Sequence, residues 1–312
     1  MWHAWWYLVS LSFWRQGRSL QTLIAILLLF LFAGVVIVFS IVNNSFGRPG
    51  WNVANFTREL VVGRDNFPGV YFSLLLPLLC LCFGTQALGG EWEERSLVWV
   101  LTHPIPRPMI YLAKFTAALP WTLACTVGGL WLAGFAAGSR HVDFGWNAAI
   151  AERLPAMGPF SAPVLLEDLL EPGKIQPTVM WPGLEVASCL WPCVMWGSIA
   201  YLSLFMLFGA LFRRSTVLGM AYAFLLEGLI GAMPGLLKRI SLAFYTRCMA
   251  YDWAGQQSWP TALGTLGIDP SRTSIVLPVP GVIALGVLIG VTVLLLLLGA
   301  WRFSSKEYHD LT

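Results

Sequence analysis

Long apolar stretches alternate with shorter polar ones along this chain of 312 residues. An α-helix needs about 20 mostly apolar residues to cross the hydrocarbon core of a bilayer, and several of the stretches have that length. The pattern therefore predicts an all-α integral membrane protein with six transmembrane helices. The predicted spans cover residues 20–42, 69–90, 109–137, 186–212, 215–231 and 281–301.

The first residues carry large apolar side chains at the spacing of one helix face. They are Trp2, Trp5, Trp6, Val9 and Phe13. This spacing predicts an amphipathic helix over residues 1–18 that lies in the membrane interface. The longest polar segment, residues 138–185, is rich in proline and charged residues and is expected to form a small outer lobe. Because the lobe is shorter than most independent domains, we predict one transmembrane domain over residues 1–312.

The composition agrees with a membrane protein. Hydrophobic residues make up 57% of the chain and charged residues only 11%, whereas soluble domains average about 25% charged residues. The net charge of +3 is small and says nothing about nucleic acid, and no nucleic-acid partner is expected. Most of the six cysteines lie in apolar runs, where free cysteine usually serves as a small buried side chain, and no metal site is expected.

Lysine and arginine are concentrated on one side of the predicted membrane. Nine of the 19 fall in short segments of about 55 residues in total, which include both termini and residues 91–107. The other ten are spread over about 115 residues, together with ten acidic residues. Since short cytoplasmic segments are enriched in Lys and Arg, both termini are predicted to be cytoplasmic in a multi-pass protein of the plasma membrane, such as a bacterial inner membrane.

The sequence contains no catalytic motif. The four histidines lie outside the predicted spans, and neither a zinc-protease nor a serine-hydrolase pattern occurs. Gly173-Lys174 is followed by Ile175 and lacks the earlier glycine of a phosphate-binding loop. The chain is therefore predicted not to be an enzyme and to hold no cofactor. If ATP and Mg²⁺ drive its work, they are expected on a separate chain.

The most acidic short stretch lies between the second and third predicted spans. It reads Glu91-Trp92-Glu93-Glu94-Arg95-Ser96-Leu97 and continues to Pro104-Ile105-Pro106-Arg107 and Lys114. Carboxylates buried unpaired in hydrocarbon would cost several kcal/mol or more, so this stretch must lie in water at one membrane face. The two flanking spans hold it near the lipid, where it is well placed to contact a soluble partner.

This stretch resembles the signature of the ABC-2-type permeases, the six-span membrane subunits of ABC exporters. In that family a Glu follows span 2, a small pair precedes a Leu, and Pro-hydrophobic-x-Arg leads to a Lys that opens span 3. The matching residues are Glu91, Leu97, Pro104, Arg107 and Lys114. The family often has Gly-Thr where this chain has Arg95-Ser96, so the turn before Leu97 departs from the pattern.

The resemblance implies a permease that moves substrate across or out of the membrane with ATP hydrolysed on a separate P-loop ATPase subunit. It implies two ATPase copies, a second permease copy or a paralogue, and contact with membrane lipid. The stretch after span 2 would be the coupling helix that docks on the ATPase. The docking residues would be Glu91, Glu93, Glu94, Arg95 and Arg107.

Glu227 is the one ionisable residue deep inside a predicted span, about 20 Å from Arg214 along an α-helix. An acid at this depth is a candidate for gating or substrate passage. The alternative is a structural role, as a hydrogen-bonded group or as the partner of Lys238 or Arg239. The structural alternative predicts that Glu227→Gln is mild.

Two other functions compete with transport. An intramembrane enzyme would need a cluster of reactive groups within the spans, and only Glu227 is found there. A membrane assembly factor or scaffold that works without an ATPase would have the same topology as a permease. A neighbouring gene for a P-loop ATPase would favour the permease over the scaffold. The sequence does not indicate the substrate.

Overall fold

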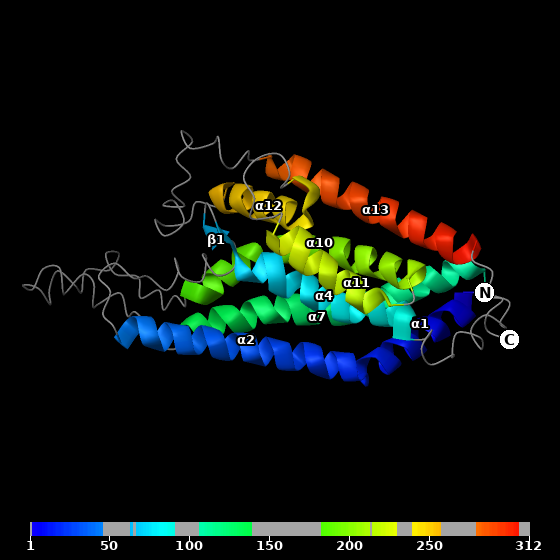
Figure 1. Cartoon of the computed structure of the whole chain (residues 1–312), viewed down its shortest axis with the longest axis horizontal. Helices are drawn as coiled ribbons and strands as arrows, with labels where there is room; N and C mark the ends of the chain where they lie inside the picture. The colour runs from blue at the N-terminus through cyan, green and yellow to red at the C-terminus, as the bar shows by residue number, and fades with distance from the viewer. Residues whose placement is uncertain are drawn as a thin grey trace, which may run out of the picture.

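The computed structural model of the chain describes residues 2–45, 63–64, 67–90, 106–138, 182–212, 214–229, 239–256 and 279–305. Nearly all of these residues are helical, and the long helices run side by side in one elongated bundle (Figure 1). The fold is that of an all-α membrane protein, as the sequence predicts. Almost all of the predicted outer lobe, from residue 139 to residue 181, lies outside the described residues.

The described elements follow one another in a simple order. The chain begins with α1 (Trp2–Gly17), α2 (Leu20–Ser45) and an antiparallel hairpin of β1 (Gly63–Arg64) and β2 (Phe67–Pro68). The second membrane segment consists of the π-helical η1 (Tyr71–Leu75), α4 (Leu76–Thr85) and the π-helical η2 (Gln86–Gly90). The remaining elements are α7 (Arg107–Gly138), α10 (Pro182–Leu211), α11 (Ser215–Tyr222), the π-helical η4 (Ala223–Leu229), α12 (Leu242–Gln256) and α13 (Gly281–Ser305).

Five helical segments in the described part of the chain are long and apolar enough to cross a membrane. They are Leu20–Val38, Tyr71–Gly89, Arg107–Ala136, Leu190–Leu211 and Gly281–Ser305. Each lies within or around one of the predicted spans. The agreement has a physical cause, because a helix satisfies every backbone hydrogen-bonding group internally and is one of few structures that hydrocarbon tolerates.

Of the predicted span over residues 215–231, the structure describes α11 and η4, from Ser215 to Leu229. This described apolar segment is shorter than the five above. Its length is about 22 Å at the rise of an α-helix, against about 30 Å of hydrocarbon. The helix α12 begins at Leu242, and most of its described side chains are buried.

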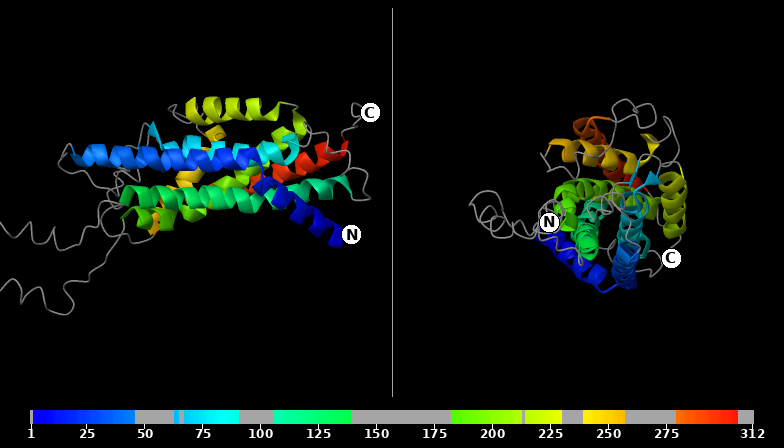
Figure 2. Two further views of the ribbon diagram at one scale, coloured as in Figure 1. Left: turned by 90° about the horizontal axis from the view of Figure 1, so that it is seen from below. Right: turned by 90° about the vertical axis from the view of Figure 1, so that its left-hand side faces the viewer.

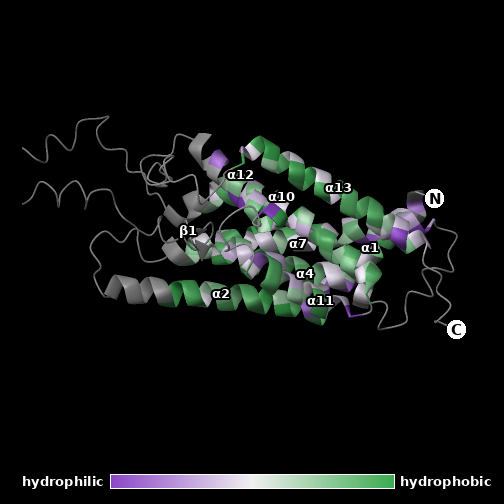
Figure 3. Ribbon diagram, turned by 45° about the horizontal axis from the view of Figure 1, so that its top comes forward, coloured by the Kyte–Doolittle hydropathy of each residue, from purple (hydrophilic) through white to green (hydrophobic). Residues whose placement is uncertain are grey.

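The centre of the bundle is α10, which contacts α4, α7, α12 and α13. Its side chains Tyr201, Phe205 and Met206 are fully buried, and the rings of Tyr201 and Phe205 are stacked with their centroids 6.1 Å apart. By contrast, α2 and α13 expose apolar side chains along the bundle (Figure 3), such as Leu27 at 67% and Leu297 at 65%. These surfaces suit contact with lipid chains.

The N-terminal helix α1 leaves α2 at an angle (Figure 2) and packs against α7. The rings of Phe13 and Trp121 are stacked at 5.1 Å, and the indole N–H of Trp121 donates to the Phe13 carbonyl oxygen at 3.0 Å. The predicted apolar face is confirmed in part. Trp5, Val9 and Phe13 are half-buried, whereas Trp6 is 55% exposed.

Gly84 of α4 lies where the backbone of α10 comes closest. A Cβ atom on Gly84 would lie 2.7 Å from the Phe205 Cβ and 3.3 Å from the Leu202 carbonyl oxygen. Backbone atoms cannot move aside as a flexible side chain can, so α4 and α10 would have to separate. Small residues at helix crossings have this role in membrane bundles.

We expect Gly84→Ala to lower the thermal unfolding midpoint of the purified protein, because overpacking costs about 1–3 kcal/mol. Gly286→Ala in α13 is the matched control, since no neighbouring atom lies within 4 Å of its added Cβ. The control should unfold at or above the wild-type midpoint. Equal midpoints for the two variants would contradict the close contact between α4 and α10.

Candidate functional site

One end of the bundle gathers several cations. The elbow between α1 and α2, the start of α7, the start of α11 and the last turn of α13 all lie at this end (Figure 1). Its described arginines are Arg15, Arg18, Arg107, Arg214 and Arg302. We call this the cationic end.

The described acidic residues lie elsewhere. They are Glu185 in the first turn of α10, Glu227 in η4 and Asp252 in α12. None belongs to the helix ends that form the cationic end, so the described charged residues of those helix ends are all basic. The charge asymmetry that the sequence predicts is therefore present in the arrangement of the helices.

The predicted docking stretch joins two helices at the cationic end. Glu91, Glu93, Glu94 and Arg95 lie outside the described residues. The element before them, η2, and the helix after them, α7, are described and meet this end of the bundle (Figure 1). The described chain therefore stops before this stretch and resumes after it at the same end of the bundle.

Arg107, the fifth predicted docking residue, is exposed and is the first residue of α7. Its guanidinium Nη1 donates a hydrogen bond to the Ser304 carbonyl oxygen of α13 at 3.3 Å. This contact joins the start of α7 to the last turn of α13. Lys114, the last residue of the sequence motif, is buried within α7 at 3% exposure.

The elbow between α1 and α2 is tied to the end of the second span by hydrogen bonds. The Gln16 amide Nε2 donates to the Phe83 carbonyl oxygen at 3.2 Å, and the Ser19 hydroxyl donates to Gln86 Oε1 at 2.9 Å. Within the elbow, the Thr22 hydroxyl donates to the Gln16 carbonyl oxygen at 2.6 Å. These bonds fix the elbow to η2, which directly precedes the predicted docking stretch.

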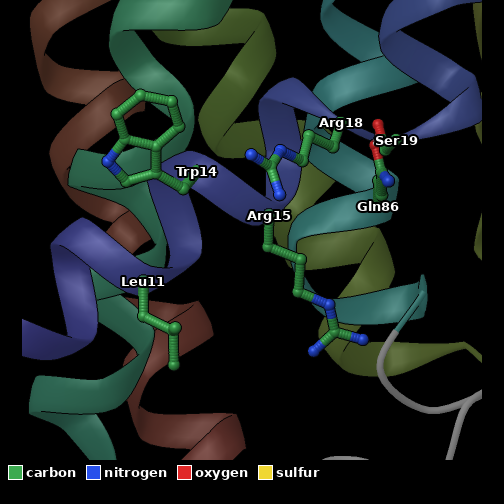
Figure 4. Close-up of a pocket in the computed structure, with 6 residues that line it drawn as sticks. All are labelled: Leu11, Trp14, Arg15, Arg18, Ser19 and Gln86. Carbon is green, nitrogen blue, oxygen red and sulfur yellow. Dashed lines mark hydrogen bonds between the residues drawn. The ribbon is translucent and has the colours of Figure 1, made fainter.

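A pocket of about 500 Å³ lies beside this elbow. Its lining residues are Leu11, Trp14, Arg15, Arg18, Ser19 and Gln86 (Figure 4). In the view of Figure 4, Arg18 lies between Trp14 and the pair of Ser19 and Gln86, and Arg15 extends below it. The pocket thus combines two cationic side chains with an apolar wall and two neutral polar groups.

Glu227 is fully buried in η4 and is surrounded by hydrogen-bond donors. Its Oε1 accepts from the Tyr222 hydroxyl and from the Leu242 backbone N–H, both at 3.0 Å. Its Oε2 accepts from the Ala243 backbone N–H at 3.2 Å and from the Ser241 hydroxyl. Each carboxylate oxygen therefore accepts one backbone N–H and one hydroxyl.

These bonds cap the N-terminus of α12. The first N–H groups of a helix have no partner inside the helix, and the Glu227 carboxylate takes those of Leu242 and Ala243. The Ser241 hydroxyl accepts the next one, from Phe244, at 3.3 Å. An acidic side chain at this position also interacts favourably with the positive end of the helix dipole. Glu227 therefore joins η4 to α12, across a gap in the described chain.

The partners of Glu227 differ from those that the sequence suggested. A structural role is in keeping with the geometry, but Arg239 is exposed and the observed donors are Tyr222, Ser241 and the start of α12. Lys238 lies outside the described residues. Ser241 is an N-cap residue type ahead of an apolar run, and that signal could have located both the helix start and one partner.

A second carboxylate caps the following helix. The Asp252 Oδ2 atom accepts the Gly281 backbone N–H at 2.9 Å, at the first residue of α13. Glu227 of η4 therefore holds the start of α12, and Asp252, in the second half of α12, holds this helix to the start of α13. Nothing in the sequence alone paired these residues.

Comparison with known families gives one match. Residues 17–159 match the model of a family described as ABC-2 family transporter protein. The match covers the first span, the second span, the predicted docking stretch and α7. None of the curated proteins matches the chain.

The capping geometry makes Glu227→Gln costly rather than mild. A Gln side chain has one acceptor oxygen, so its amide nitrogen would face either the Leu242 or the Ala243 N–H, and a buried donor left without a partner costs about 1–3 kcal/mol. We expect a lower thermal unfolding midpoint for Glu227→Gln. The control Tyr222→Phe removes one hydroxyl and leaves both backbone donors satisfied, so its midpoint should fall less. A Glu227→Gln protein as stable as wild type would contradict the capping role.

Proposed function

Since residues 17–159 match the model of a family described as ABC-2 family transporter protein, we propose that this chain is an ABC-2-type permease, which moves its substrate across or out of the membrane with energy from a separate P-loop ATPase chain. The observation that supports this proposal is the position of η2 and α7, the described elements on either side of the predicted docking stretch. Both reach the cationic end, where hydrogen bonds join neighbouring helix ends.

Those ties provide a route for mechanical coupling. A partner that pushes on residues 91–105 acts on η2 and α7 at once. Because Ser19 is hydrogen-bonded to Gln86, a movement of η2 would also move the elbow of α1 and α2. Because Arg107 is hydrogen-bonded to Ser304, a movement of α7 would also move α13. Closure of the ATPase would then shift several spans as rigid bodies, which is a common form of conformational switching in proteins.

The proposed partners follow from the charges of the stretch. Glu91, Glu93 and Glu94 would face basic groups of the ATPase, while Arg95 and Arg107 would face acidic ones. ATP and Mg²⁺ would bind on two ATPase copies, and a second permease copy or paralogue would complete the transporter. The enrichment of arginine at the cationic end favours the cytoplasmic side for this end, in the plasma membrane.

Glu227 has a structural role in this proposal. Its carboxylate oxygens accept hydrogen bonds from the Tyr222 and Ser241 hydroxyls and from the first backbone N–H groups of α12. It would hold the short pair α11 and η4 against α12 while the spans move. The proposal therefore assigns the transport path to other residues.

Reversing charge at two acids of the docking stretch tests the proposal. In Glu91→Lys/Glu94→Lys, the basic groups of the ATPase would meet like charges, and losing an interfacial charge pair typically costs 2–5 kcal/mol. We expect the amount of ATPase that copurifies with each permease to fall by about tenfold or more, with membrane insertion intact.

The control is Glu307→Lys/Asp310→Lys in the C-terminal tail, which makes the same change in net charge outside the docking stretch. It should retain wild-type ATPase recovery. If Glu91→Lys/Glu94→Lys also keeps wild-type recovery and ATP hydrolysis, the stretch is not the docking surface. Copurification of no ATPase with the wild-type chain would favour the scaffold function instead.

A further inference from the structure

The pocket beside the elbow of α1 and α2 has the chemistry of a phosphate site. Arg15 and Arg18 both line it, and arginine forms strong, often bidentate, hydrogen bonds to phosphate oxygens. Ser19 and Gln86 add neutral polar groups that a phosphate or a glycerol oxygen can contact. No acidic residue is among the lining residues, so the pocket suits an anion.

The other lining residues point to a lipid as the source of that phosphate. Leu11 and Trp14 form the apolar wall, and they are exposed at 56% and 64%. Further along α1, Trp6 and Tyr7 are also exposed, at 55% and 73%. A free phosphate ion gains no binding free energy from an apolar surface. The glycerol and acyl parts of a phospholipid, by contrast, cover such a surface and remove it from water.

The position of the two arginines along the chain agrees with the depth of lipid headgroups. The uncharged apolar run of α2 begins at Leu20, which is 73% exposed, and Arg18 lies two residues before it. Headgroup phosphates lie just outside the hydrocarbon, the level at which Arg, Lys and Trp side chains gather. Arg18 therefore lies at the height where a phosphate of the adjoining leaflet is found.

We propose that this pocket binds the phosphate group of an anionic phospholipid from the leaflet at the cationic end. The lipid contacts α1 through Trp14 and Arg15, the elbow through Arg18 and Ser19, and η2 through Gln86. It thus joins three elements that meet at the elbow. This assignment concerns a resident lipid, not the transported substrate, and it does not depend on the identity of the ATPase.

The test counts bound lipids on the full chain. The protein is purified in a neutral detergent, titrated with phosphatidylglycerol or phosphatidylcholine, and analysed by native mass spectrometry. Wild type should bind phosphatidylglycerol in preference to phosphatidylcholine. Arg15→Gln and Arg18→Gln should each raise the phosphatidylglycerol concentration at half occupancy by about fivefold, the change that corresponds to about 1 kcal/mol per basic residue.

Two further variants separate the pocket from general charge effects. Arg302→Gln removes one exposed cation from the same end of the bundle but not from the pocket, so its half-occupancy concentration should stay at the wild-type value. Arg18→Lys keeps the charge but loses the planar fork, and it should give an intermediate value between wild type and Arg18→Gln. It also keeps the measurement usable if Arg18→Gln fails to fold.

Three outcomes would overturn the proposal. One is equal loss of lipid in Arg302→Gln and in the pocket variants, which would mean attraction to net charge only. Another is equal binding of phosphatidylcholine and phosphatidylglycerol by wild type. The third is displacement of phosphatidylglycerol by millimolar inorganic phosphate, which would assign the pocket to the free ion rather than to a lipid.

Discussion

The N-terminus of α12 lies among buried side chains, since Ser241, Leu242 and Ala243 are exposed by only 1%, 6% and 3%. An unsatisfied backbone group in such surroundings costs several kcal/mol, so a helix can start there only if another part of the chain supplies acceptors. Glu227 and Ser241 supply them, for Leu242, Ala243 and Phe244. The Glu227 carboxylate of η4 thus bonds to the start of α12, and the Asp252 carboxylate of α12 bonds to the start of α13. These two caps join η4, α12 and α13 into one connected unit.

The opposite end of the bundle depends on a different set of contacts. There, the elbow of α1 and α2 is bonded to η2, and α7 is bonded to α13. The close approach of α4 to α10 at Gly84 joins the second span to the centre of the bundle. An element that connects η2 to α7 is therefore connected to most of the spans. This explains why a short polar stretch between two spans is a suitable place for a partner to act.

The sequence predicts the long spans well, because an uncharged run of sufficient length forms a helix in hydrocarbon whatever its neighbours are. The span predicted over residues 281–301, for example, begins where α13 begins and ends four residues before the end of α13 at Ser305. The stretch after the fifth predicted span is different. The helix α12 contains Thr246, Arg247 and Asp252, so its composition does not predict a membrane span, and it is buried where α10 and α13 pack against it.

The candidate sites, like the helices, are predicted from the sequence only in part. Glu227 is conspicuous in the sequence as an acid in an apolar run, but its partners Ser241 and Ala243 are identified only by the fold. Arg15 and Arg18 contribute to the charge asymmetry, yet Gln86, which completes the pocket, is far from them in the chain. Four of the predicted docking residues, Glu91, Glu93, Glu94 and Arg95, lie outside the described residues and remain predictions from the motif.

We propose that this chain is the membrane half of a transporter whose ATPase is a separate protein. The mass of the intact complex after mild detergent extraction from the native membrane, followed by identification of its chains, tests this. We expect two permease chains, either two copies or one copy with a paralogue, together with two P-loop ATPase chains. A stable particle that contains one permease chain and no ATPase would contradict it.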